Sequence, residues 1–361
     1  MDETVRNPVT GWARAEALLW WIQGRSVPPL LSQSPAGTPL GQAGVLGTPG
    51  TQVVEGGGDG TGGLRLGGRY TLGLWIDDGC KAFGLEGSFF HLPGSTDSGS
   101  VGGQGISGRP FVNALTGQPD AELVSFPGVL AGIATTELRT SLMGADALVR
   151  CPLCYDPCGT GPRFDVLVGY RWLRYEEDLI ARENLFPQGE AFVPGTNIQV
   201  QDQFRIRNNF HGLLLGLAST WRIQRVTLEA AGRVSVGHLH RNVQINGQTT
   251  VIVPGEPVVV NSGGLLAQSS NIGNYNRNSW TAIPEADLRL GYDVSDSLRL
   301  FAGYSLLVLN DFYRVGDVID TNVNPNLLPP STPGGPLRPS FQPSSGLIWV
   351  HGITLGAELR F

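Results

Sequence analysis

The chain has 361 residues, of which 51 are glycine and 25 are proline, and only 16% of its residues are charged. Its net charge of -6 and its single lysine, Lys81, argue against a nucleic-acid-binding protein, which needs a dense basic face. A hydrophobic fraction of 41% excludes a wholly disordered chain. The lack of any run of about 18 apolar residues excludes a transmembrane helix.

Ten segments alternate between apolar and polar side chains, which is the two-residue period of a β-strand. In residues 11–22, the apolar Ala15 and Leu19 alternate with Arg14 and Glu16. A tilted strand needs about 9–11 residues to cross a bilayer, so each segment is long enough to span. The other segments are residues 66–76, 82–92, 135–150, 164–175, 202–219, 226–236, 282–292, 298–308 and 347–361.

The connections between these segments alternate strictly between long and short. The long ones are residues 23–63, 93–134, 176–201, 244–278 and 312–345, and the short ones are 77–81, 151–162, 220–225 and 294–297. Long extracellular loops and short periplasmic turns are typical of outer-membrane barrels. The sequence therefore predicts an all-β fold, a single closed antiparallel transmembrane β-barrel of about ten strands (roughly 8–12) over residues 11–361. Residues 1–10 form a periplasmic N-terminal segment.

A soluble, secreted β-sandwich that binds a ligand is the alternative fold, because its strands alternate in the same way. Its apolar face would point inward and its charged face to water, and one strand alone does not distinguish the two folds. Aromatic residues near the strand ends favour the membrane barrel, because such residues form girdles at both membrane interfaces. These residues are Trp20, Trp21, Trp75, Phe89, Trp172, Trp221, Trp280 and Trp349.

The last strand ends on an aromatic residue with alternating apolar residues before it. This pattern resembles the signal read by the outer-membrane barrel assembly machinery, which is therefore an expected partner. The residues are Ile353, Leu355, Ala357, Leu359 and Phe361.

Three further motifs carry a resemblance over almost the whole chain, from Trp12 to Phe361. They are Ala15-Glu16-x-Leu18-Leu19-Trp20-Trp21, Asp165-x-Leu167-x-Gly169-Tyr170-Arg171, and Gly303-Tyr304-Ser305-Leu306-Leu307 followed by Tyr313-Arg314-Val315-Gly316-Asp317. With them the chain resembles putative β-barrel porin family seven. The resemblance implies a barrel in the bacterial outer membrane, with lipid around it and no cofactor, and it brings no catalytic or ligand-binding residues.

The face opposite the apolar one carries equal numbers of positive and negative side chains on the eight clearest strands. Such a lumen should be cross-linked by arginine–carboxylate pairs and give little ion selectivity. Barrels of about eight strands are filled by side chains, whereas aqueous channels accompany about 16–18 strands, so we expect a narrow or plugged lumen. Inward glycines such as Gly73 and Gly356 should restore some space. The predicted lumen charges are Arg14, Glu16, Arg69, Glu86, Asp165, Arg171, Glu229, Arg233, Glu285, Asp287, Arg289, Arg299, Glu358 and Arg360.

The four cysteines, Cys80, Cys151, Cys154 and Cys158, fall in two predicted periplasmic turns. The spacing C-x2-C-x3-C could bind zinc with Cys80 as the fourth ligand. An even number of cysteines in an oxidising compartment favours disulfides instead, although their pairing does not follow from the sequence.

Histidines and a loop motif offer two further candidate metal sites. His238 and His240 share one strand face, but no third ligand is identifiable, so a solvated or interfacial pair is favoured. Oxygen ligands in loop 312–345 could bind calcium. The favoured interpretation is that these acids form turn and side-chain bonds with Arg314 that pin the loop. The motif comprises Arg314, Gly316, Asp317, Asp320, Asn322 and Asn324.

Two functions fit this barrel. One is a narrow porin-like channel for passive permeation of small solutes, and the other is a non-conducting barrel that acts through its extracellular loops, where binding residues usually lie. The sequence names neither a solute nor a surface partner, and it opens on Met1-Asp2-Glu3-Thr4 with no visible secretion signal.

An enzyme is not expected. A barrel protease would need its acidic residues at the outer rim, whereas Asp77 and Asp78 lie at the periplasmic end. A barrel lipase would need a serine and a histidine together on the lipid-facing rim, and no such pairing is evident.

Overall fold

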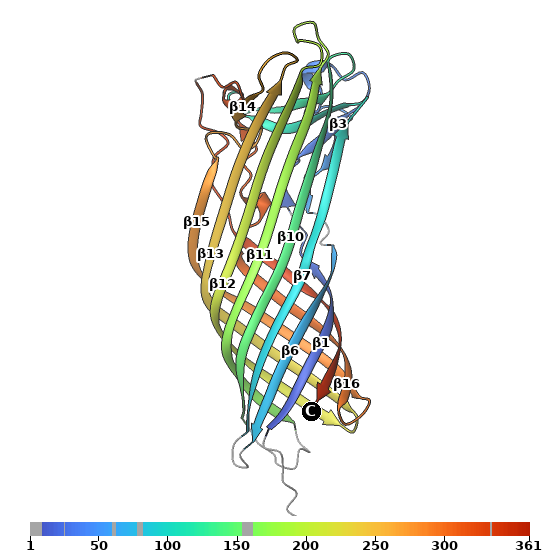
Figure 1. The fold of residues 1–361 in the computed structure, drawn as a ribbon, viewed down its shortest axis with the longest axis vertical. Helices are drawn as coiled ribbons and strands as arrows, with labels where there is room; N and C mark the ends of the chain where they lie inside the picture. Colours follow the sequence, from blue (N-terminus) through green and yellow to red (C-terminus); the bar gives the residue numbers. More distant parts are fainter. Residues whose placement is uncertain (1–8, 25, 60–62, 78–81, 154–161, 333) are drawn as a thin grey trace, which may run out of the picture.

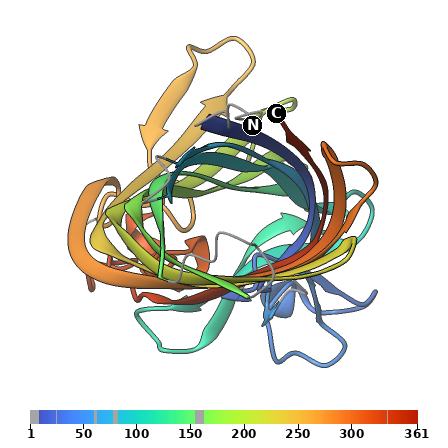
Figure 2. The ribbon, with the colours of Figure 1, turned by 90° about the horizontal axis from the view of Figure 1, so that it is seen from below.

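Ten long antiparallel strands form the barrel in the part of the chain that the computed structural model describes, residues 9–24, 26–59, 63–77, 82–153, 162–332 and 334–361. Each strand pairs with the next in chain order, and β1 pairs with β18 to close the sheet, as Figure 2 shows along the barrel axis. The predicted all-β closed barrel is confirmed, and each predicted segment falls on one strand. The strands are β1 (Val9–Ile22), β6 (Leu64–Asp77), β7 (Ala82–Gly102), β10 (Leu130–Pro152), β11 (Arg163–Pro187), β12 (Asn197–Ile223), β13 (Val226–Ile252), β15 (Gly273–Asp293), β16 (Leu298–Phe312) and β18 (Gly346–Arg360).

Strands β7 to β15 extend much further into the extracellular space than the sequence predicted (Figure 1). Much of the expected loops 93–134, 176–201 and 244–278 is therefore regular sheet. For example, β11 and β12 stay paired from Arg163 opposite Thr220 up to Leu185 opposite Ile198.

The extension was not predicted because apolar and polar side chains exchange faces part-way along the strands. In β11, the outward Phe164, Val168 and Tyr170 are apolar and exposed, as lipid contact requires. Beyond Trp172 the outward positions become polar, beginning with Arg174, while the inward positions become apolar. The upper part of the sheet thus has the pattern of a water-soluble barrel, and the reversal marks the extracellular membrane boundary.

Shorter elements cover the extracellular end of the barrel. A small sheet in the order β17-β8-β3-β4, with β9 paired to β8, joins segments from three different loops. None of the helices among the described residues is long and apolar enough to cross a membrane. These elements are β2 (Ser26–Val27), β3 (Leu31–Ser34), β4 (Gln52–Glu55), β5 (Gly58–Asp59), β8 (Ile106–Asn113), β9 (Pro119–Ser125), β14 (Val259–Ser262), β17 (Asn322–Val323), and the 3-10 turns η1 (Leu40–Gln42), η2 (Val315–Asp317) and η3 (Pro325–Leu327).

The predicted girdle position is wrong for two of the eight aromatic residues, because their side chains face the lumen. Trp20 is 1% exposed inside the barrel, and Trp75 lies at its periplasmic mouth. The other predicted aromatics face outward, with Trp280 the most exposed at 76%. Adjacent Trp20 and Trp21 necessarily point to opposite sides, since successive side chains of a strand alternate.

The inward glycines do not open the lumen as expected, because larger neighbours occupy the space beside them. A Cβ atom on Gly73 would lie 2.0 Å from the Trp12 ring, and one on Gly356 would lie 2.5 Å from the Phe301 ring. These glycines therefore allow aromatic side chains to pack inside the barrel.

Candidate functional site: the closed lumen

The lower half of the lumen contains a layer of ion pairs. All fourteen predicted lumen charges lie on inward positions, and each takes part in at least one ion pair. We call this set, with its added partners, the ionic layer. Four of the added partners were not predicted: Asp146, Arg150, Arg163 and Asp293. The first two lie on segment 135–150, which alternates less regularly than most, and the other two lie just beyond predicted strand ends.

Several of these pairs reach across the barrel from one wall toward the other. Arg14 of β1 lies 3.5 Å from Glu229 of β13, and Arg69 of β6 lies 3.5 Å from Asp287 of β15. In both cases three strands separate the partners along the shorter way around the sheet. The planar guanidinium fork lets one arginine meet several carboxylates, so these side chains span the lumen.

An apolar belt closes the lumen above the ionic layer. Its side chains come from nine of the ten barrel strands, and Leu142, Leu173 and Phe210 among them are 0% exposed. The rings of Tyr175 on β11 and Phe312 on β16 pack edge to face, with centroids 6.3 Å apart. All sixteen side chains are at most 6% exposed, so the belt forms a buried apolar layer between the two ends of the lumen. It consists of Leu18, Trp20, Ile22, Phe90, Leu92, Leu142, Leu173, Tyr175, Phe210, Leu239, Ile283, Leu307, Leu309, Phe312, Ile348 and Val350.

The extracellular loops fold inward and form a cap over the apolar belt. Asn208 of β12 binds the backbone of Tyr313 with two hydrogen bonds of 2.9 Å, and Glu177 of β11 accepts the N–H of Val315. A second apolar cluster buries Leu31, Val124 and other cap residues completely. The cap is therefore a packed structure that fills the upper barrel.

A buried polar cluster attaches the cap sheet to the wall of the barrel. Arg109 of β8 donates to Glu183 of β11 at 2.6 Å and to Asp202 of β12 at 2.7 Å. Asp202 also accepts the backbone N–H of Ala267. Burial, together with the neighbouring Glu183, raises the pKa of Glu122 on β9 well above its usual range. Three carboxyl groups thus share one arginine inside the cap.

The loop motif forms hydrogen bonds within the protein. The guanidinium of Arg314 donates to the carbonyl oxygens of Gln23 and Gly24, which ties the loop to the end of β1. Asp317 accepts the N–H of Arg314, and Gly316 lies between them in η2. These contacts agree with the pinning role favoured from the sequence.

The remaining residues of the motif also take part in contacts within the cap. Although burial opposes it, hydrogen bonds from Arg338 and Asn322 lower the pKa of Asp320. Asn324 donates to the carbonyl oxygens of Gly334 and Pro336. The side chains that could have held calcium are therefore engaged by the loop itself.

All five histidines lie on the outer wall of the barrel. His211 and His238 are paired opposite each other on β12 and β13, close to the extracellular membrane boundary. His238 packs edge to face on Trp280, and His240 forms a hydrogen bond with Asn278. These contacts support the interfacial interpretation of the pair. The histidines are His91, His211, His238, His240 and His351.

The cysteine hypothesis stays a prediction. Cys151 is exposed at the end of β10 and forms no disulfide with a described residue. Cys80, Cys154 and Cys158 lie outside the described residues, and so does Asp78 of the acidic pair.

The predicted assembly signal forms the lipid-facing side of β18. Ile353, Leu355 and Leu359 are about half exposed on the outer wall, and Ala357 lies between them. The backbone of Phe361 exchanges two hydrogen bonds with Gly11. The chain end thus contributes directly to the seam that closes the barrel.

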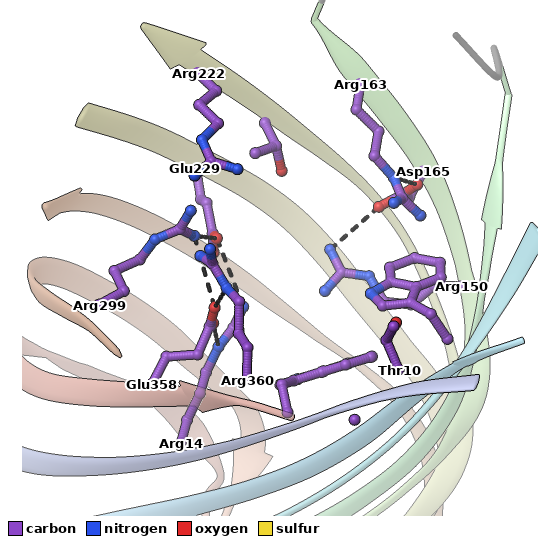
Figure 3. Close-up of a pocket in the computed structure, with 14 residues that line it drawn as sticks. Thr10, Arg14, Arg150, Arg163, Asp165, Arg222, Glu229, Arg299, Glu358 and Arg360 are labelled. Atoms are coloured by element: carbon purple, nitrogen blue, oxygen red, sulfur yellow. Dashed lines mark hydrogen bonds and ion pairs between the residues drawn. The ribbon is translucent and has the colours of Figure 1, made fainter. Parts of the chain in front are cut away.

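A vestibule opens at the periplasmic mouth, within the ionic layer (Figure 3). Its volume is about 320 Å³, and Arg14, Glu229 and Glu358 of the ionic layer line it. Figure 3 shows two groups of arginine side chains on opposite sides of this space, one around Glu358 and one around Asp165. The lumen thus consists of three successive parts: the ionic layer with its vestibule, the apolar belt and the cap.

Comparison with known proteins identifies one family. The sequence model of the family described as putative beta barrel porin-7 matches residues 12–361. A comparison with curated proteins gives no match. Among solved structures, the outer membrane protease OmpT from Escherichia coli is similar at 11% identity over 99% of both chains, with a TM-score of 0.42. A major outer membrane protein from Thermus thermophilus is similar at 9% identity, over 98% of this chain and 99% of that one, with a TM-score of 0.27.

Proposed function

Because this chain belongs to the putative beta barrel porin-7 family, it is an outer-membrane β-barrel, and we propose that its resting state does not conduct and that it acts by presenting its cap at the cell surface. The observation that carries this proposal is the apolar belt. A layer of buried apolar side chains presents a high barrier to hydrated solutes, because polar groups lose their hydrogen bonds to water in such a layer.

The cap supports the second part of the proposal. Its sheet combines segments from loops far apart in the sequence, and the buried Arg109 cluster attaches it to the barrel. A rigid scaffold that positions loops is the usual arrangement for a binding surface. The cap is thus suited to contact with a surface partner.

A narrow channel for small solutes is the competing proposal, and the porin name of the family supports it. Single-channel recording in a planar bilayer distinguishes the two. We expect the folded wild-type protein to show no conductance steps, and discrete steps would overturn the closed-barrel proposal.

Two variants extend the same experiment. Deletion of residues 314–344 removes much of the cap, yet it should leave the protein silent, because the apolar belt remains. In that deletion variant, joint replacement of Trp20, Phe210 and Phe312 by alanine should produce conductance, because the lumen then lacks both much of the cap and the large side chains of the belt. The lipid-facing substitution Leu217→Ala is the matched control, and it should stay silent.

We propose further that the protein is not an enzyme. The outward position of all five histidines supports this, because none can act as a general base in the lumen or cap. Incubation of the reconstituted protein with quenched peptide and lipid ester substrates should release no product, and turnover by the folded barrel would refute the proposal.

A further inference from the structure

The vestibule has features that the closed lumen does not explain. It lies within the ionic layer, on the periplasmic side of the apolar belt, and is open to solvent. An inference about it is therefore independent of whether the apolar belt conducts.

Arginines outnumber carboxylates on the described walls of the vestibule. Six arginines line it, against three carboxylates. Glu86 and Asp293 lie outside this lining; Glu86 pairs with Arg150, and Asp293 pairs with Arg222, Arg299 and Arg360. Each of the three lining carboxylates already has more than one arginine: Asp165 pairs with Arg150 and Arg163. Similarly, Glu358 pairs with Arg14 and Arg360. The lining arginines are Arg14, Arg150, Arg163, Arg222, Arg299 and Arg360.

The buried polar atoms left without a partner on this lining are all donors. They are Nε1 of Trp12, Nε of Arg150 and Nη2 of Arg163. Trp12 is only 5% exposed, so its indole N–H has little access to water. Among the described lining residues, no buried oxygen atom lacks a hydrogen bond. A buried donor without an acceptor costs free energy, which an acceptor-rich ligand would recover.

Two arginines at the mouth are accessible to such a ligand. The guanidinium of Arg163 stacks over Trp75, 3.6 Å from the ring centroid, which holds its planar fork in place. Its side chain is 36% exposed, and that of Arg222 is 52% exposed. Figure 3 shows these two side chains projecting from different strands at the same end of the vestibule.

We propose that the vestibule is a binding site for a small oxyanion, a carboxylate or a phosphate, that enters from the periplasm. Arginine forks bind both groups through paired N–H donors. The volume of about 320 Å³ limits the ligand to a small molecule or the charged end of a larger one.

Titration calorimetry on the protein in lipid nanodiscs tests the proposal, with inorganic phosphate, succinate and uncharged glycerol as probes. We expect saturable binding of phosphate, succinate or both, weaker at high salt, and none of glycerol. Preference between the two anions identifies the oxyanion. No saturable binding of either anion, or equal binding of glycerol, would overturn the proposal.

Variants locate the site. The double substitution Arg163→Gln and Arg222→Gln should weaken binding by at least about tenfold, because each removes a charged donor. Arg139→Gln, at an arginine 66% exposed on the outer wall, is the matched control and should bind like the wild type. Both proteins should retain the electrophoretic mobility of a folded barrel. Unchanged affinity in the folded double variant would refute the vestibule as the site.

Discussion

Arg69 of β6 and Asp287 of β15 lie 3.5 Å apart inside the barrel, on strands that are not neighbours. Arg69 also approaches Glu16 at 3.7 Å and Glu285 at 3.9 Å, and its guanidinium lies 5.1 Å from the ring of Trp20. One side chain therefore connects three carboxylates of the ionic layer with the apolar belt above it.

Replacing Arg69 by methionine should destabilise the barrel strongly. The substitution keeps much of the side-chain volume but leaves the buried Glu16, Glu285 and Asp287 with one cation fewer. Removal of one partner from a buried ion pair costs about 3–5 kcal/mol. The measurement is the unfolding temperature in detergent, followed by the loss of the heat-modifiable band. Arg139→Met, on the exposed outer wall, is the control, and equal unfolding temperatures for the two variants would contradict the prediction.

Adding one methyl group at Gly356 should also destabilise the protein. Its Cβ atom would lie 2.5 Å from the Phe301 ring, and overpacking of this kind costs about 1–3 kcal/mol. Gly232→Ala is the matched control, since a Cβ there meets nothing within 4 Å. Urea unfolding of both variants in detergent tests the difference, and a neutral Gly356→Ala would show that Phe301 is free to move.

The attachment of the cap should weaken as pH rises. Glu122, Glu183 and Asp202 surround the single Arg109, and burial raises the pKa of Glu122 and of Glu183. A carboxyl whose folded pKa is raised loses its stabilising contribution as pH increases from its ordinary range to the raised value. Hydrogen exchange of residues 106–125 should therefore be faster at pH 8 than at pH 5, after correction for intrinsic rates.

The variant Glu122→Gln separates this effect from general loosening of the cap. It removes the titrating group but keeps its shape and hydrogen-bonding atoms, so most of the pH dependence should disappear. An unchanged pH dependence in Glu122→Gln would assign the effect to another group.

Removal of Phe361 should reduce insertion of the barrel into the outer membrane of living cells. We propose that the barrel assembly machinery reads this residue with the alternating apolar side chains before it. The measurement is the amount of folded protein in the outer-membrane fraction, with Phe361→Tyr as the control that keeps an aromatic end. Refolding of the purified variant into detergent should change much less, and an equal loss there would indicate a structural role at the Gly11 seam.

The barrel could be predicted from the sequence because lipid and lumen impose opposite requirements on alternate residues. Phe164, Asp165 and Val168 illustrate the rule within one segment. The upper strands were missed because water replaces lipid beyond Trp172, so the same faces exchange their polarity. The apolar residues no longer occupy the same alternate positions after this exchange, so the strand is predicted to end there.

The layers inside the lumen could be predicted only in part. Balanced charges such as Arg14 and Glu229 predicted ion pairs, but which of them meet across the barrel depends on the tilt and register of the whole sheet. The apolar belt was not predicted because inward residues such as Leu173 and Phe210 lie where the two faces of the strands exchange polarity. In that zone both faces carry apolar side chains, so the inward face cannot be distinguished.

The length of the paired strands has a mechanical consequence. Strand β12 has 27 residues, which at about 3.3 Å each gives a contour of roughly 90 Å, against an apolar band of about 25 Å. Even with a steep tilt, the extracellular end of the sheet, which encloses the cap, lies well beyond the lipid headgroups. The proposed surface partner can therefore bind there without contacting the bilayer. A force on the cap passes into hydrogen-bonded sheet rather than into flexible loops.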